Sequence, residues 1–287
     1  YEQSGSYNIS FVTELQGTVF TYLISHFVPS WDLIKISEYQ YNSNETLEEL
    51  SMRDKILLNE ANQAAVLVSY SKANKKININ DALFYVFYLD ENIISSEKIK
   101  IGDILVSCDD IVLRYDNLDE LRAYLSNKDE RDQVVYTFNR NGTEYTTTIT
   151  LRKVDGVVIA GFSLSPIYDF SLEPKILFDF GNRESGSSGG LMTALAIYDT
   201  LLEEDLTHGL KIAGTGTLQI DGSVGEIGGV KYKLKGAVNS GADIFFVPFV
   251  ENYDECMEIK KNKKYDIDIV GVNTFDDAVS YLEKLSK

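Results

Sequence analysis

The 287-residue chain contains few of the residues that cross-link or interrupt folds: two cysteines, two histidines, four prolines and one tryptophan. Cys108 and Cys256 lie far apart, and neither belongs to a CxxC pair. The ligand count therefore excludes a structural zinc site, and it leaves a disulfide between the two cysteines open. With so few prolines, no linker marks a domain boundary. No apolar run reaches the roughly 18 residues that a membrane span needs.

Basic residues are outnumbered, with 27 lysines and arginines against 44 aspartates and glutamates and a formal charge of -17. Such a surface repels phosphate backbones and anionic lipids, so we expect no nucleic-acid partner. The sequence has no GxxxxGK[ST] run, which excludes a P-loop ATPase module. A hydrophobic content of 44% and an aromatic content of 11% indicate a globular fold of one or two domains.

The first 78 residues predict a strand followed by helices. Apolar residues around Ile9 alternate as in a strand, and a short helix is expected to begin near Thr18. His26 lies in an apolar run, which favours a core or boundary histidine. A longer helix begins after Thr46, because Thr46 and Glu49 form a capping-box pair ahead of a helical stripe. The stripe consists of Leu47, Leu50, Leu57, Leu58, Ala61, Ala65 and Val68.

Short strands are predicted after residues 75–80, where the helical pattern breaks. The runs LFYVFYL and KIKIGDILVSCDDIVL indicate strands, and Asp116 or Asn117 caps a helix that follows them. Asn141-Gly142 marks the turn of a hairpin between the strands that end at Phe138 and begin at Tyr145.

This order of strands and helix, with KIGDILVSCDD at its centre, resembles a PDZ domain over residues 79–154. The resemblance implies binding of an extended peptide or chain end by strand addition. At Asp81–Phe84 the chain lacks the glycine that is usual in the family's carboxylate-binding loop, which puts capture of a terminal carboxylate in doubt. A small strand-rich interaction domain without a peptide groove stays open as the alternative.

Residues 155–287 predict an α+β unit. The segments VVIAGFSL and KILFDF are expected to be strands that lead to Ser188, where a helix begins and runs to about Glu203. A strand KIAGTGTLQI and a tight turn at Asp221-Gly222 precede a helix that ends at Gly241. The strand IFFVP, a helix near 253–260, the strand IDIVGV and a terminal helix capped by Thr274 complete the unit.

Ser188 stands between glycines in GSSGG, at the start of a helix whose stripe contains Leu191, Leu195, Tyr198 and Leu202. The unpaired N–H groups of such a first turn can stabilise an oxyanion beside the serine. A flexible Gly/Ser loop is the structural alternative. A serine hydroxyl needs a nearby base. His208 lies too close in sequence for an α/β-hydrolase and is more simply a solvated loop histidine, so lysine is the remaining candidate.

The order of SGSSGGLMTALAIYD, AGTGTLQIDGSVGEIGGVKYK and IFFVP resembles the proteolytic domain of Lon-type serine-lysine peptidases. With the PDZ-like part and the helix after Thr46, nearly the whole chain resembles the PDZ-bearing, ATP-independent members of that family. The resemblance implies Ser188 as nucleophile, Lys233 as its base and Thr215 as the residue that orients the lysine. Lys231 and Lys235 are the competing lysines, expected to be solvated.

Three positions near Ser188 depart from the family pattern, which is usually Gly-Pro-Ser-Ala-Gly. Ser187 stands at the proline and Gly189 at the alanine, and Ser185 stands where an acidic residue is common. A free lysine has a pKa of about 10.4, so Lys233 can act as a base only if burial against Val230, Leu234 or the Ser188 helix lowers that pKa by about 3 units.

Together these features predict an α+β protein with residues 1–78 as an N-terminal strand/helix segment, 79–154 as the PDZ-like domain and 155–287 as the Lon-type proteolytic domain. The expected activity is ATP-independent serine endopeptidase cleavage of extended peptides or unfolded protein segments, with the PDZ-like domain binding or gating substrate. No cofactor and no metal are expected. The resemblance further implies an anchor upstream of Tyr1 and a place on the outer side of a bacterial membrane.

Two other functions stay open from the sequence. One is a catalytically silent peptide-binding or scaffold protein of the same fold. The other is a histidine-dependent serine hydrolase that uses His208.

Overall fold

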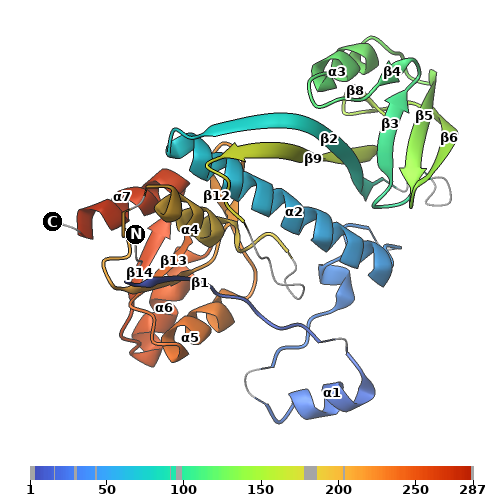
Figure 1. The fold of residues 1–287 in the computed structure, drawn as a ribbon. Coiled ribbons are helices and arrows are strands. Elements are labelled where there is room, and N and C mark those ends of the chain that lie inside the picture. Colours follow the sequence, from blue (N-terminus) through green and yellow to red (C-terminus); the bar gives the residue numbers. More distant parts are fainter. Residues whose placement is uncertain are drawn as a thin grey trace.

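The structure, a computed structural model, describes residues 4–15, 17–28, 31–42, 44–90, 92–94, 99–177, 186–202 and 204–285. Helices and strands are mixed throughout, which confirms the expected α+β class (Figure 1). The helices are α1 (Val19–Ser25), α2 (Leu47–Lys72), α3 (Leu118–Ser126), α4 (Gly190–Leu202), α5 (Val230–Asn239), α6 (Tyr253–Lys263) and α7 (Phe275–Leu285), with a 3-10 turn η1 (Ile36–Glu38). The strands are β1 (Ser6–Ile9), β2 (Lys76–Leu89), β3 (Ile104–Cys108), β4 (Ile111–Val112), β5 (Gln133–Arg140), β6 (Thr143–Thr150), β7 (Arg152–Val154), β8 (Val157–Ile159), β9 (Phe162–Glu173), β10 (Lys211–Gly214), β11 (Thr217–Leu218), β12 (Val224–Gly225), β13 (Ile244–Pro248) and β14 (Asp268–Val272).

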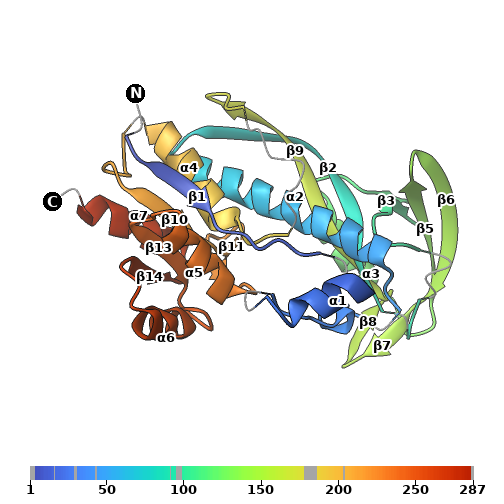
Figure 2. The ribbon, with the colours of Figure 1, turned by 90° about the horizontal axis from the view of Figure 1, so that it is seen from below.

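The C-terminal unit is built on a parallel sheet in the order β1-β10-β13-β14. Helices cover both faces, because side chains of a strand alternate between faces. Ile244 and Phe246 of β13 pack with α4 and α7, whereas Phe245 and Val247 pack with α5 and α6. The first strand of the chain closes one edge of this sheet, so the N-terminal segment and the C-terminal unit are one body (Figure 2).

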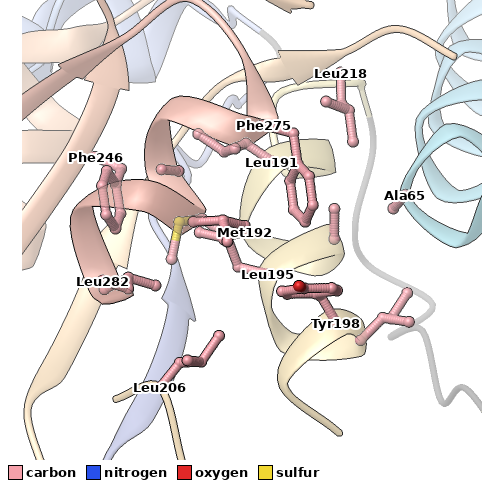
Figure 3. Close-up of a cluster of buried hydrophobic side chains, with 14 of the residues drawn as sticks. Ala65, Leu191, Met192, Leu195, Tyr198, Leu206, Leu218, Phe246, Phe275 and Leu282 are labelled. Carbon is pink, nitrogen blue, oxygen red and sulfur yellow. The ribbon is translucent and has the colours of Figure 1, made fainter. Parts of the chain in front are cut away.

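Helix α4 is buried on nearly all sides and forms the centre of the larger core. Leu191, Met192, Leu195 and Tyr198 point from α4 toward β13 and α7, as Figure 3 shows. The predicted stripe of the helix is therefore confirmed as core-facing. Burial of this kind holds the first turn of α4, which begins two residues after Ser188, in a fixed position.

Helix α2 joins this core to the strand-rich part of the molecule. Thr46 caps it as predicted. The Thr46 hydroxyl accepts a hydrogen bond from the Glu49 N–H, and the Glu49 carboxylate accepts one from the Thr46 N–H. Ser69 near its C-terminal end donates to the Ala194 carbonyl of α4 at 2.8 Å, while Gln63 accepts from the Tyr168 N–H of β9. Leu47, expected in the buried stripe, is instead exposed, because it lies in the first turn beyond the packing partners of the helix.

The strand-rich part is a sheet in the order β6-β5-β3-β2-β9, with β4 paired to β3 and α3 beside it. The predicted hairpin is confirmed as β5 and β6, and Asn141 and Gly142 both take positive φ at its turn. Strands β2 and β9 pair along almost their whole length and form a ribbon that reaches the α2–α4 core (Figure 1). Because β2 begins at Lys76, it runs continuously through the predicted boundary between residues 78 and 79.

Several local predictions are wrong. The strand predicted at LFYVFYL begins earlier, at Lys76, because Lys76–Ile79 also pair with β9. Of the predicted strand KILFDF, residues 175–177 are irregular after Pro174, which has no N–H for a ladder, and 178–180 lie outside the described residues. The strand KIAGTGTLQI is interrupted at Thr215 and Gly216 between β10 and β11.

His26 is exposed rather than buried. It is the residue after α1, its Nδ1 lies 2.9 Å from the Tyr22 carbonyl, and α1 buries none of its residues. An apolar run thus does not mean a core position here. Cys108 and Cys256 are both buried and free, so they do not form the disulfide that the sequence left open. Within the described residues, no helix has the length and apolarity to cross a bilayer.

Candidate active site

Ser188 lies two residues before α4, and hydrogen bonds hold its backbone to the connection between β10 and β11. The Ser188 carbonyl accepts from the Gly216 N–H at 2.8 Å and from the Thr215 hydroxyl at 3.1 Å. In return, the Gly216 carbonyl accepts from the Leu191 N–H at 3.2 Å. These bonds fix the backbone on both sides of the serine, and its half-buried side chain points to the start of α5.

Lys233 on α5 reaches this serine. Its Nζ lies 2.9 Å from Ser188 Oγ and 3.2 Å from Thr215 Oγ1, and the residue is only 4% exposed. Gly229, in the left-handed conformation with φ of 67°, caps the helix and turns the chain into it. Lys233 follows Val230 by three residues and precedes Ala237 by four, so it shares their buried face.

Thr215 supplies the second hydroxyl oxygen within hydrogen-bond distance of Lys233 Nζ. The residue is fully buried, and its one hydroxyl proton goes to the Ser188 carbonyl. Thr215 Oγ1 therefore accepts from Lys233, which uses one N–H of the amine. In the neutral amine, the lone pair is then free to accept the Ser188 hydroxyl proton. The three side chains form one consistent proton arrangement for a serine and an uncharged lysine.

Burial lowers the pKa of Lys233 from its ordinary value of 10.5 to about 8. Desolvation of the ammonium is the main cause, and the negative charge of Glu14 acts in the opposite direction. Within the described residues, no carboxylate forms an ion pair with Lys233. With a pKa of about 8, roughly one amine in ten is uncharged at pH 7, compared with about one in several thousand for a free lysine.

Two glycines allow the segments around Ser188 to pack closely against each other. A Cβ on Gly190 would lie 3.0 Å from the Leu218 side chain and 3.2 Å from the Leu218 nitrogen. A Cβ on Gly216 would lie 2.9 Å from Val224 Cγ1. A larger residue at either position would push α4 away from β11 and β12, so these glycines are required by close approach rather than by flexibility.

The first turn of α4 also offers hydrogen-bond donors beside the nucleophile. Gly190 N–H donates to the Ser187 carbonyl at 3.3 Å, whereas the N–H groups of Ser188 and Gly189 make no hydrogen bond within the part of the chain that the structure describes. Free N–H groups at a helix start carry partial positive charge and are suited to an oxyanion. Gly189 has no side chain to cover them.

The other predicted candidates lie elsewhere. Lys231 is half-exposed and pairs with Asp32 at 2.5 Å, and Lys235 is exposed, so both lysines are in contact with solvent as expected. His208 is exposed, and its Nε2 lies 3.2 Å from the Leu282 carbonyl of α7 rather than at Ser188. Ser185 lies outside the described residues. In the residues that are described, no group of three or more His, Cys, Asp or Glu side chains is arranged to hold a metal ion.

The structure adds one element that the sequence pattern did not indicate, the segment after β1. Ile9 lies against Gly189, since a Cβ there would be 3.3 Å from the Ile9 side chain, and Val12 lies equally close to Gly229. Glu14 then acts on Lys233 through its charge, and Tyr39 donates to Glu14 at 3.0 Å. No local motif could have shown this, because Ile9, Val12 and Glu14 lie some 180 to 220 positions before Gly189, Gly229 and Lys233.

Comparisons with known proteins relate part of this chain to proteases. Residues 182–284 match the family described as the Lon protease (S16) C-terminal proteolytic domain. The chain is 29% identical over 137 residues to the Lon protease of Mesomycoplasma hyopneumoniae (strain 232), covering 44% of this chain and 15% of the relative. It is 35% identical over 97 residues to the Lon protease of Campylobacter concisus (strain 13826), covering 33% and 12%. The chain thus spans less than a sixth of the length of these relatives.

Among solved structures, the chain is similar to PDZ domains of SdrC-like proteins. One is from Listeria monocytogenes, with 19% identity, a TM-score of 0.26 and coverage of 28% of this chain and 85% of that domain. Another is from Listeria innocua, with 18% identity, a TM-score of 0.26 and coverage of 29% and 92%.

Proposed function

We propose that this chain, in which residues 182–284 are a Lon-type proteolytic domain, is a serine endopeptidase that uses a Ser188/Lys233 dyad. The observation that carries the proposal is the 2.9 Å separation of Lys233 Nζ from Ser188 Oγ in a setting that favours the uncharged amine. The substrates are extended peptides or unstructured segments of proteins. Thr215 is the residue that positions the amine.

In the proposed reaction, neutral Lys233 accepts the Ser188 hydroxyl proton while Ser188 Oγ attacks the peptide carbonyl carbon. The carbonyl oxygen becomes an oxyanion, for which the N–H groups of Ser188 and Gly189 are the available donors. Lys233 then gives its proton to the leaving amine, which breaks the C–N bond and leaves an acyl-enzyme. A water molecule repeats the sequence, with Lys233 again as base, and releases the acid and the free serine.

The proposal includes cleavage without ATP, and residues 1–287 contain no P-loop motif. The proposed substrates are already extended when they reach Ser188. The strand-rich part, residues 79–154 in the predicted division, is proposed to bind or gate such chains. Its supporting feature is α2, which contacts β9 through Gln63 and α4 through Ser69 and thereby connects the ribbon with the helix behind Ser188.

A catalytically silent scaffold of the same fold is the competing function. The buried lysine argues against it, because a protein that only binds peptides gains nothing from holding an unpaired amine beside a serine hydroxyl. A hydrolase based on His208 is disfavoured by the placement of that ring on α7. The outer side of a bacterial membrane remains the proposed location, and protease accessibility in intact cells tests it.

A serine-reactive fluorophosphonate probe tests the dyad. We expect covalent labelling of the wild type at Ser188, no labelling of Ser188→Ala, and at least a 1000-fold slower rate for Lys233→Met, because the hydroxyl loses its base. Lys235→Met, which removes an exposed lysine of the same helix, should label at the wild-type rate. Full labelling of Lys233→Met would reject the dyad.

A further inference from the structure

The parallel sheet ends at β14, and the outer side of this strand is an open edge. Among the described residues, β14 forms a ladder with β13 only. The Asp268 N–H donates to the Asp243 carbonyl directly before β13, at 2.9 Å, so the backbone groups of Asp268 face inward. Because successive residues of a strand point their N–H and C=O groups to opposite sides, those of Ile269 and Gly271 point outward. Such an edge can pair with a further extended chain.

A pocket of about 390 Å³ opens at this edge, lined by residues 268–271 of β14 and by Phe249, Tyr253 and Tyr281. Tyr253 of α6 packs against the core on one face of the sheet and Tyr281 of α7 against the core on the other, and the two helices lie on opposite sides of the strand in Figure 1. The rings of Phe249 and Tyr253 stack with centroids 5.4 Å apart. Both rings lie directly on Gly271, since a Cβ there would be 2.7 to 2.8 Å from them. The open edge is therefore flanked by aromatic rings on both faces.

One carboxylate lies in this pocket, that of Asp268. Burial and, to a lesser extent, the negative charge of Asp268 raise the pKa of Tyr281, which agrees with a carboxylate close to that ring. Asp268 is exposed and forms no ion pair within the described residues, not even with the lysines in the last turn of α6, Lys260, Lys261 and Lys263. A carboxylate beside aromatic faces suits a cationic side chain, which gains an ion pair and cation–π contacts together. The formal charge of -17 of the whole chain favours a cationic partner as well.

We propose that the β14 edge binds an extended segment of another protein that carries an arginine or lysine, and that this cationic side chain enters the pocket beside Asp268. The backbone of the partner pairs with the outward groups of Ile269 and Gly271, and its cation lies among the aromatic rings. The site lies two strands away from β10, which leads to Thr215. It is therefore a docking site besides the proposed cleavage site, and it does not depend on the dyad.

Fluorescence anisotropy with the full chain tests the charge preference, in the Ser188→Ala background so that no peptide is cut. The probe is a fluorescein-labelled peptide of Val, Thr and Ser with one central arginine, and its control has glutamine in that place. We expect the arginine peptide to bind about tenfold more tightly. Asp268→Asn should remove this difference, whereas Asp266→Asn, which changes an exposed carboxylate outside the pocket, should leave it unchanged. Equal affinity for both peptides, or an undiminished preference in Asp268→Asn, would overturn the proposal.

Two N-methylated forms of the arginine peptide test pairing with the strand edge. One carries methyl groups on every second backbone amide, and the other carries them on the intervening amides. In an added strand only alternate amides donate to β14, so we expect one form to bind about tenfold more weakly than the other. Equal affinity of the two forms would overturn strand addition. With Ser188 present, Asp268→Asn should react with the fluorophosphonate probe at the wild-type rate, and a slower reaction would contradict a site separate from the dyad.

Discussion

The molecule buries two cations in opposite ways, Lys233 beside Ser188 and Arg53 on α2. The two residues are 4% and 3% exposed. Arg53 forms an ion pair with buried Glu45, donates to the Tyr39 carbonyl and has its guanidinium 3.7 Å from the Tyr41 ring centroid. The Lys233 amine has only hydroxyl oxygens as hydrogen-bond partners in the described structure.

The difference shows why burial by itself does not indicate catalysis. Arg53 keeps its charge because a guanidinium does not lose its proton in proteins, and Glu45 compensates that charge. Lys233 has no such compensation, so desolvation lowers its pKa toward neutrality. A buried cation with a carboxylate partner keeps its charge, whereas one with only hydroxyl partners loses its proton more readily.

The largest expected effect concerns the paired cation. Arg53→Met leaves Glu45 buried without a partner, and we expect a loss of about 3 to 5 kcal/mol in the free energy of unfolding, measured by urea denaturation. Combining it with Glu45→Gln should restore part of the loss. Arg122→Met, which breaks the exposed pair with Asp119, should cost less than about 1 kcal/mol. Equal losses in both variants would contradict the assigned role of Arg53.

For Lys233, which has no carboxylate partner among the described residues, we expect that replacement increases the free energy of unfolding at low pH. Below pH 8 the wild type carries a buried ammonium that the unfolded chain solvates freely, so Lys233→Met should be relatively more stable there. As pH rises from about 8 to 10.5 the folded amine is neutral first, and wild-type stability should recover by about 3 kcal/mol relative to Lys233→Met. Lys235→Met serves as the exposed control. A stability difference that does not vary over this pH range would show that burial does not depress the pKa of Lys233.

Thr215 tests whether the hydroxyl partners orient the amine. Thr215→Val keeps the shape but removes the acceptor of Lys233 and the donor to the Ser188 carbonyl, and kcat should fall about 10- to 100-fold. Thr215→Ser retains the hydroxyl and should keep most of the rate. Measured kcat and KM on one short peptide separate orientation from binding, because KM should change little. Equal activity of the valine and serine variants would remove Thr215 from the proposed arrangement.

Glu14 should produce the smallest effect. Its carboxylate favours the charged amine, so Glu14→Gln lowers the pKa of Lys233 further and moves the pH profile of kcat/KM in the acid direction. In the wild type, we expect kcat/KM to rise about tenfold per pH unit at low pH and to level off above the pKa of Lys233, near pH 8. Glu144→Gln removes a charge from β6 and should leave the profile in place. If Glu14→Gln moved the pH at which kcat/KM levels off to a higher value, it would contradict the sign of this interaction.

Much of the local structure followed from short-range patterns. The capping box of Thr46 and Glu49, the Asn141-Gly142 hairpin and the stripe of α4 depend on residues a few positions apart, and their physics is local. The failures have tertiary causes. His26 and Leu47 look like core residues in the sequence, yet both are exposed in the structure. Residues 76–80 form a strand only because β9, far along the chain, supplies the ladder.

The site divides in the same manner. Family resemblance directed attention to Lys233, while the residues alone left Lys231 and Lys235 open. Helical spacing contributes part of the distinction, because neighbours two positions away lie on the opposite side of α5 from Lys233. The electrostatic interaction of Glu14 with Lys233 had no sequence signal.

The sequence by itself determined the helix behind Ser188, the glycines that let the chain pass close to it and the general acidity of the molecule, because these depend on side-chain type and short spacing. Tertiary structure alone decided which lysine loses water and which apolar side chains stay outside the core. Desolvation depends on every element that surrounds a group in space, and here those elements come from positions 9 to 14, 188, 215 and 229 to 237.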